Sequence, residues 1–256
     1  MQMTQVRNAT IVLEVGGKTV LVDPMLGARG STDAFPSETG NTSRNPLVDL
    51  VVTLGDLLTP DVVVVTHTHP DHWDVAAAAL LPRDVPVLVQ HDADAEVVAK
   101  DGFTDVRVLA EPITVDGTVF TRTGGRHGSD EALAAMPEVL GEVMGVVVSH
   151  PDEPVVYVAG DTILTDDVRS ALEQHDPDVV VLNTGGAVPT PMGPIIMGAE
   201  DVVEVHRLAP RARLVAVHME ALNHCPVTRA DVRTAAAEQG IDDSVLVPED
   251  GEVLTF

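Results

Sequence analysis

Residues 61–72 read Asp-Val-Val-Val-Val-Thr-His-Thr-His-Pro-Asp-His. The four valines, Val62–Val65, form a short apolar run of the kind that is typical of a buried strand. Three imidazoles and one carboxylate follow within the six residues His67–His72. Such groups gather at the end of a buried strand when a divalent cation uses their lone pairs. A histidine-rich surface loop without a metal is the alternative, and it accounts poorly for the ligand spacing.

The spacing predicts how these side chains are shared between two positions. His67 and His69 project to one side, because side chains alternate along an extended chain. Pro70 cannot donate a ladder hydrogen bond, so it ends regular pairing and turns the chain. Asp71 and His72 then lie on the turn, where they can face a neighbouring position. The segment therefore offers two ligands to one ion and two to another.

Composition excludes several classes of protein. The 256 residues include 40 acidic and 15 basic side chains, which gives a net charge of −25. Such a surface repels phosphate backbones, so we expect no nucleic-acid partner. Because Cys225 is the single cysteine, an internal disulfide and a cysteine-rich zinc site are excluded. No base lies beside it in the sequence, so we expect a structural role for it and not that of a nucleophile. No stretch has the length of a membrane span, and the N-terminus lacks an apolar signal region, so we expect a cytoplasmic protein without a membrane partner.

Hairpins dominate the first part of the chain. Thr10–Val15 and Lys18–Val22 flank a diglycine turn, and Gly145–Ser149 and Val155–Ala159 flank a second predicted turn. A further hairpin is predicted around Asp116-Gly117. The long aperiodic stretch from Asp23 to Pro46 follows a strand, and we expect it to be a lid or a pocket wall.

Strands alternate with helices through much of the remaining sequence. The predicted helices are Asp74–Leu81, Asp92–Asp101, Asp166–His175, Ala199–Leu208 and Thr228–Gln239. The predicted strands between and after them include Val85–Val89, Val106–Leu109, Val179–Leu182, Leu214–Val217, Val245–Val247 and Glu252–Leu254. This pattern favours one mixed α/β (α+β) domain over residues 1–256, with helices outside two sheets.

The histidine cluster cannot complete two metal sites alone, and three further candidates each follow a predicted strand. His127 comes shortly after the strand that ends near Thr123, Asp161 follows Val155–Ala159, and His218 ends the run Leu214–Val217. Ligands and loops meet at the edge of a sheet, so each is placed where it could join the cluster. The alternatives are a turn histidine for His127 and a helix cap for Asp161.

With these residues the chain resembles the metallo-β-lactamase-fold hydrolases. Their pattern is His-x-His-x-Asp-His, then a histidine, an aspartate and a final histidine, each ending a strand. The matching positions are His67, His69, Asp71, His72, His127, Asp161 and His218. The Gly160-Asp161-Thr162 turn looks most like the branch that contains L-ascorbate-6-phosphate lactonase and N-acyl-phosphatidylethanolamine phospholipase D.

The resemblance implies a fold, a ligand set and a cofactor. The fold would be a four-layer αββα sandwich of the metallo-β-lactamase type, with the metals at one edge. One ion would be held by His67, His69 and His127, and the other by Asp71, His72 and His218, with Asp161 bridging. We therefore expect two divalent metal ions, with zinc as the first choice and manganese or iron as alternatives.

The resemblance also implies an enzyme, a metal-dependent hydrolase. A metal-bridging hydroxide would attack a small ester, lactone, amide or phosphodiester, and Asp71 could also take up or orient a proton. His224 is the second candidate catalytic residue, facing the substrate or supporting a ligand; an ordinary loop histidine is the alternative. Asn183 either holds substrate or forms a turn, and Arg126 either pairs with an anionic substrate or with surface acids.

Two other functions remain open. A mononuclear-iron oxidoreductase of the sulfur dioxygenase type keeps the same histidine motif, so metal identity separates it from a hydrolase. Flavodiiron proteins typically carry glutamate where this chain has His69. A catalytically inactive binding protein would have no chemical reason to keep all seven ligands. We expect a small-molecule substrate as the partner, and homo-oligomer formation stays open.

Overall fold

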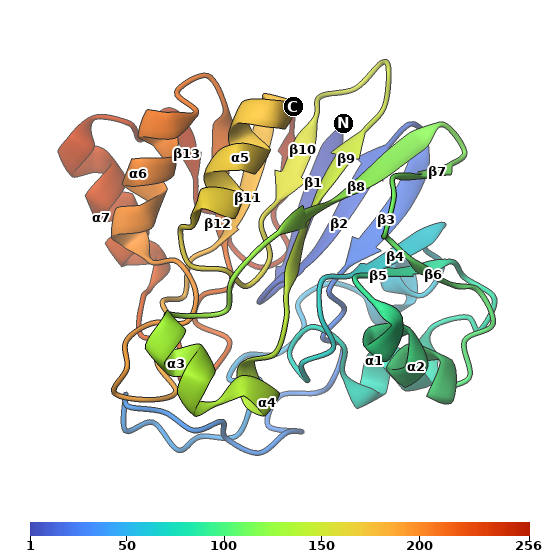
Figure 1. The fold of residues 1–256 in the computed structure, drawn as a ribbon, viewed down its shortest axis with the longest axis horizontal. Helices are drawn as coiled ribbons and strands as arrows, with labels where there is room; N and C mark the ends of the chain where they lie inside the picture. The colour runs from blue at the N-terminus through green and yellow to red at the C-terminus, as the bar shows by residue number, and fades with distance from the viewer.

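Two seven-stranded sheets face each other, with helices on both outer sides, in the computed structural model of residues 1–256 (Figure 1). The strand orders are β14-β1-β2-β3-β4-β5-β6 and β13-β12-β11-β10-β9-β8-β7. The first sheet holds β1 to β6 and β14, and the second holds β7 to β13. The chain therefore builds the first sheet, crosses once to the second, and returns at its end with β14.

The first sheet changes from antiparallel to parallel pairing at β3. Its strands are β14 (Val253–Thr255), β1 (Gln2–Arg7), β2 (Thr10–Val15), β3 (Lys18–Val22), β4 (Val62–Val65), β5 (Val87–Val89) and β6 (Val106–Val108). Pairing is antiparallel from β14 to β3 and parallel from β3 to β6. Because β3, β4 and β5 are parallel, the loops after them leave the same edge of the sheet.

The second sheet has the same mixed character. Its strands are β13 (Val245–Leu246), β12 (Arg213–Val217), β11 (Val179–Asn183), β10 (Val156–Val158), β9 (Met144–Ser149), β8 (Thr118–Gly124) and β7 (Ile113–Val115). Pairing is parallel from β13 to β10 and antiparallel from β10 to β7. The carboxyl ends of β10, β11 and β12 therefore meet at one edge.

The valines of β4 show how sequence periodicity produces the layers. Val62 and Val64 belong to the cluster of buried side chains between the two sheets, whereas Val63 and Val65 pack on the outer side against helices. Those helices are α1 (Val75–Leu80) and α2 (Asp92–Lys100). Because both faces of β4 are buried, side chains on both faces must be apolar, and no polar residue interrupts the strand.

Three helices cover the outer face of the second sheet in the same way. They are α5 (Asp166–His175), α6 (Ala199–Leu208) and α7 (Arg229–Gln239), and they share a second large apolar cluster with β11 and β12. Helices and sheets thus form the four layers of an αββα sandwich, as the sequence predicted (Figure 1). No helix is both long enough and apolar enough to cross a membrane.

Several elements were not predicted. β1 carries buried polar side chains, Gln5 and Arg7, so it lacks the apolar run that marks the other strands. Two short helices, α3 (Asp130–Ala135) and α4 (Pro137–Leu140), and a 3-10 turn, η1 (Leu54–Leu57), are too short to show a helical period. In Figure 1, α3 and α4 lie at the edge of the molecule along which the N-terminal loop also runs.

Candidate metal centre

The seven predicted ligands meet at one edge of the sandwich, from four places in the sequence. Their ligand atoms form two groups, each with all atoms within 4.8 Å of one another. The first group is His67, His69 and His127, and the second is Asp71, His72, Asp161 and His218. All are buried except His69, which is half-buried. The distribution of the motif over two positions agrees with the alternation predicted for a strand followed by a proline turn.

The turn after β4 places the motif. The backbone N–H groups of His72 and Trp73 both donate to the carbonyl of His69, at 2.9 and 2.8 Å, so the chain reverses over Pro70. The Thr68 hydroxyl donates to Asp94 Oδ1 at 2.7 Å, which ties the turn to α2. Within the motif, His67 Nε2 lies 2.9 Å from His69 Nδ1.

Asp161 lies between the two groups. Its Oδ2 is 3.2 Å from His72 Nε2 and 3.9 Å from His127 Nε2, while its Oδ1 is 3.5 Å from His218 Nε2. It is not a helix cap, because α5 begins at Asp166 with Thr165 as its N-cap residue. The preceding Gly160 has φ +69°, and a Cβ there would collide with the Met144 carbonyl, so only glycine fits.

The donor set fits a metal. Nε2 of His72 and Nε2 of His218 are both buried and have no hydrogen-bond partner, although carboxylate oxygens surround them. Buried polar atoms are rarely left without a partner. An imidazole nitrogen aimed at neighbouring carboxylates is explained when a cation lies between them, since nitrogen and oxygen donors together suit zinc, manganese or iron.

Burial and mutual charge set the protonation of the ligands. Burial lowers the pKa of His67, His69 and His127, to about 4 for His127, so these three imidazoles are neutral. A neutral imidazole is the form that binds a metal. Burial alone would raise the pKa of Asp161 and of Asp71, but the neighbouring His72 and His218 hold both below the usual range.

The same carboxylates act on the second pair of histidines. Burial disfavours a charge on His72 and on His218, yet the surrounding aspartates, with Asp161 foremost, raise the pKa of both. These two side chains therefore lie in a strongly negative environment, which favours a cation at their Nε2 atoms.

Two residues outside the predicted ligand set hold ligands in place. Asp23 is buried directly after β3, and its Oδ2 lies 2.9 Å from His72 Nδ1. Asn183 ends β11 and donates from Nδ2 to Asp161 Oδ1 at 2.7 Å. Asn183 is therefore neither a turn residue nor exposed to substrate. Partners of this kind fix the orientation of a ligand and the tautomer of an imidazole.

A hollow of about 240 Å³ opens onto both ligand groups. Its polar lining consists of ligands and one further histidine: His69, Asp71, His127, Asp161 and His224. The rest of the lining is apolar: Phe35, Pro36, Pro70, Met136, Val139, Leu140, Pro189 and Ile195. The loop from Asp23 to Pro46 thus supplies a pocket wall, and α4 with Met136 supplies another. None of the lining residues carries a positive charge.

Three other candidates are now placed. His224 is buried beside the hollow, its Nδ1 has no hydrogen-bond partner, and burial lowers its pKa to about 4. Arg126 does not line the hollow and forms an ion pair with Asp130. Cys225 has a base beside it after all, because its Sγ lies 3.8 Å from His218 Nδ1. The two residues are seven positions apart in the sequence, and no spacing rule predicts the contact.

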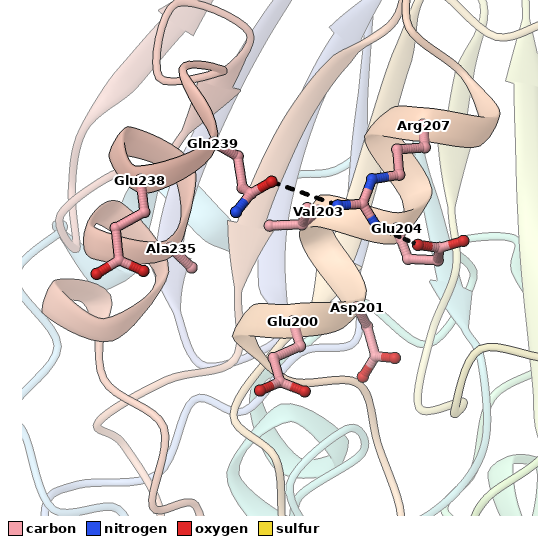
Figure 2. A pocket seen from close by; sticks show the side chains of 8 residues that line it. All are labelled: Glu200, Asp201, Val203, Glu204, Arg207, Ala235, Glu238 and Gln239. Atoms are coloured by element: carbon pink, nitrogen blue, oxygen red, sulfur yellow. Dashed lines mark hydrogen bonds and ion pairs between the residues drawn. The ribbon is translucent and has the colours of Figure 1, made fainter.

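A larger hollow, of about 500 Å³, lies between α6 and α7 (Figure 2). Its lining includes four carboxylates, Glu200, Asp201, Glu204 and Glu238, but no histidine. Arg207 already donates to Glu204 and to Gln239. This groove therefore lacks the histidines that provide most of the ligands at the first site.

Comparison with known proteins agrees with this geometry. Residues 18–219 match the sequence profile described as the beta-lactamase superfamily domain. The chain belongs to this superfamily. The UPF0173 protein YddR of Bacillus subtilis is 41% identical over 257 residues, covering 100% of both chains. A UPF0173 metal-dependent hydrolase of Methanospirillum hungatei is 31% identical over 216 residues, 80% of this chain and 82% of the relative.

A solved structure is also similar to this chain. The isothiocyanate hydrolase from Delia radicum gut bacteria is 44% identical, with a TM-score of 0.96 over 100% of this chain and 99% of the other. The present chain is a metal-dependent hydrolase of the metallo-β-lactamase fold.

Proposed function

We propose that this superfamily member is a dinuclear enzyme that hydrolyses small neutral substrates. His67, His69 and His127 would hold one divalent cation, Asp71, His72 and His218 the other, and Asp161 would bridge them. The main support is the pair of buried, unpartnered Nε2 atoms on His72 and His218 in the second group, next to the three histidines of the first group. Ligands come from both sheets, so we also propose that residues 1–256 act as one domain.

The chemistry divides between the cations and the protein. Bound at these positions, two divalent cations would supply a nucleophilic water of lowered pKa and electrophilic stabilisation of negative charge. Asp71 lines the hollow and stays ionised, so its carboxylate can orient a proton by accepting a hydrogen bond. His224 lines the same hollow and is neutral, so a free ring nitrogen can accept a proton from the attacking water and then pass that proton to the leaving group.

The hollow favours an uncharged substrate. Its lining is mostly apolar and lacks lysine and arginine, and the chain carries a net charge of −25. An anionic phosphodiester would meet no compensating side chain there and would be repelled at a distance. Of the substrate classes that the fold accommodates, small esters and lactones fit this lining better than phosphodiesters do.

Isothiocyanates are the first class to test. They are small, neutral and electrophilic at carbon, and one superfamily relative that matches over the whole chain is an isothiocyanate hydrolase. Addition of water to R–N=C=S and cleavage of the C–N bond gives R–NH₂ and O=C=S, with all atoms accounted for. The departing nitrogen must gain a proton, which is the role proposed for His224.

The test is a comparison of matched substrates on the zinc-reconstituted protein. Benzyl isothiocyanate, phenyl acetate and bis(p-nitrophenyl) phosphate are assayed at equal concentration, with kcat/KM as the readout. We expect hydrolysis of a neutral substrate at least about 100-fold faster, by kcat/KM, than hydrolysis of the phosphodiester. Preference for the phosphodiester would contradict the proposed substrate class, and no hydrolysis of any compound would contradict the proposed activity.

A further inference from the structure

Asn223 uses its whole side-chain amide on one segment of the N-terminal loop. Its Nδ2 donates to the carbonyls of Phe35 and Asn41, both at 2.9 Å. Its Oδ1 accepts from the backbone N–H of Phe35 at 3.0 Å and from Asn45 Nδ2 at 2.8 Å. Both donors and both acceptor positions of the carboxamide are therefore occupied, and the side chain is buried.

The backbone of Asn223 adds to these contacts. Its N–H donates to Asn45 Oδ1 at 2.9 Å, and its carbonyl accepts from the Thr39 hydroxyl at 2.8 Å. Neither partner is near in sequence, since Asn45 lies 178 residues away. The segment from Phe35 to Asn45 thus closes around a single residue from the far end of the chain.

Phe35 connects the segment held by Asn223 to the hollow beside the ligand groups. Phe35 and Pro36 form part of its apolar lining. The Phe35 ring packs edge-to-face on the His224 imidazole, with centroids 5.2 Å apart and an interplanar angle of 88°. The residue that holds Phe35 by its backbone is therefore the direct neighbour of the histidine on which the Phe35 ring rests.

We propose that Asn223 is a positioning residue that fixes the part of the pocket lining formed by Phe35 and Pro36. We propose further that this lining binds the apolar substituent of the substrate. The inference rests on the proposed function, in that it takes the hollow to be the substrate site. Asn223 belongs to neither ligand group. Loss of its amide should therefore weaken binding of a substrate with a large apolar arm, while metal content and turnover at saturation change little.

The isosteric variant Asn223→Asp gives the sharpest test. A carboxylate still accepts from Phe35 N–H and Asn45 Nδ2, but it turns an oxygen toward the carbonyls of Phe35 and Asn41 and repels both. Asn223→Ala removes the contacts without repulsion. Ser43→Ala is the matched control, because Ser43 lies in the same loop with an exposed side chain that makes no hydrogen bond to Asn223.

Three readouts separate positioning from a general loss of structure. Zinc per chain is counted for each variant, and hydrogen exchange is followed in residues 35–41. KM and kcat are measured for benzyl isothiocyanate and for methyl isothiocyanate, which lacks the large arm. Affinity for benzyl methyl ether, a neutral probe without a hydrolysable bond, is measured by ligand-observed NMR in parallel.

We expect both Asn223 variants to raise KM for the benzyl substrate about 10-fold, with kcat and the methyl substrate changed by less than about threefold. Exchange in residues 35–41 should become faster, zinc should stay at the wild-type level, and benzyl methyl ether should bind about 10-fold more weakly. Ser43→Ala should match wild type throughout.

Unchanged affinity for both benzyl compounds would overturn the inference, as would an equal loss for the methyl and benzyl substrates. If wild-type protein hydrolyses neither isothiocyanate, the proposed substrate fails. The benzyl methyl ether comparison then still decides whether Asn223 shapes the hollow.

Discussion

Asp23 Oδ2 lies 2.9 Å from Nδ1 of His72, and the same carboxylate accepts hydrogen bonds from the backbone N–H and the hydroxyl of Thr66. Asp23 follows β3 and Thr66 follows β4, so one buried side chain joins two parallel strand ends to a proposed ligand. Its φ of +47° is uncommon for a residue with a side chain. The contacts explain why the chain adopts it here.

Replacing Asp23 with Asn should weaken metal binding at the second group. The side-chain amide introduced at position 23 has one acceptor oxygen in place of two, so it cannot accept hydrogen bonds from both Thr66 and His72 in the same way. His72 then loses the fixed tautomer that directs its Nε2 into the site. We expect zinc affinity to fall by about 10- to 100-fold, with the fold retained. Competition with a zinc-binding dye measures this. Asp84→Asn is the control, because Asp84 is exposed. Equal zinc affinity in both variants would show that Asp23 does not orient the ligand.

A second prediction concerns His224. The variant His224→Ala should lower kcat by about 100-fold or more, since positioned acid–base groups contribute on this scale. Metal content should not change, because His224 belongs to neither ligand group. Steady-state kinetics with metal analysis on the same sample measures both. An active variant with normal kcat would reduce His224 to a packing partner of Phe35.

A third prediction concerns alkaline stability. Tyr157 is fully buried in β10, its hydroxyl has no hydrogen-bond partner, and burial raises its pKa to about 12. The neutral phenol is favoured in the folded state. This stability is present below pH 10, the unfolded value, and is lost as the pH rises toward 12. A shift of two units corresponds to roughly 2–3 kcal/mol.

The measurement is urea unfolding of wild type and Tyr157→Phe at pH 8 and at pH 11. Phenylalanine does not ionise, and it leaves no partner unsatisfied, so the two proteins should have similar stability at pH 8. The wild type should lose more stability than the variant between the two pH values. Equal losses of stability would show that the ionisation of Tyr157 is not coupled to unfolding, since the other groups that titrate at alkaline pH are the same in both proteins.

The sequence predicted the strand ends well, for a physical reason. Three of the proposed ligands come within three residues of the end of a valine-rich strand, where polar residues replace the apolar run. His67 after β4, Asp161 after β10 and His218 after β12 are such cases. The helices α5, α6 and α7 were also predictable, because their 10 or 11 residues are enough to show periodicity, whereas the six-residue α1 was predicted from its alanine content.

The supporting contacts could not be predicted in the same way. Asp23 and His72 are 49 residues apart, and Asn223 and Phe35 are 188 apart. Such pairs have no spacing rule, because only the folded chain brings them together. Asn183 resembled a turn residue because its partner, Asp161, lies 22 residues away in the sequence. β1 was missed because Arg7 is fully buried through hydrogen bonds to the carbonyls of Met25 and Gly27, which the sequence does not reveal.

The most direct test of the dinuclear proposal is the number of metal ions per chain, measured by elemental analysis of the protein as purified and again after reconstitution. Wild type should hold close to two zinc or manganese ions. His69→Ala should lose the ion of the first group, and Asp161→Ala should lose occupancy at both, each with hydrolysis abolished and the far-ultraviolet circular dichroism unchanged. His206→Ala, outside both ligand groups, should match wild type. A single iron in wild type would favour the dioxygenase chemistry, and no metal, or two ions retained in both ligand variants, would contradict the account.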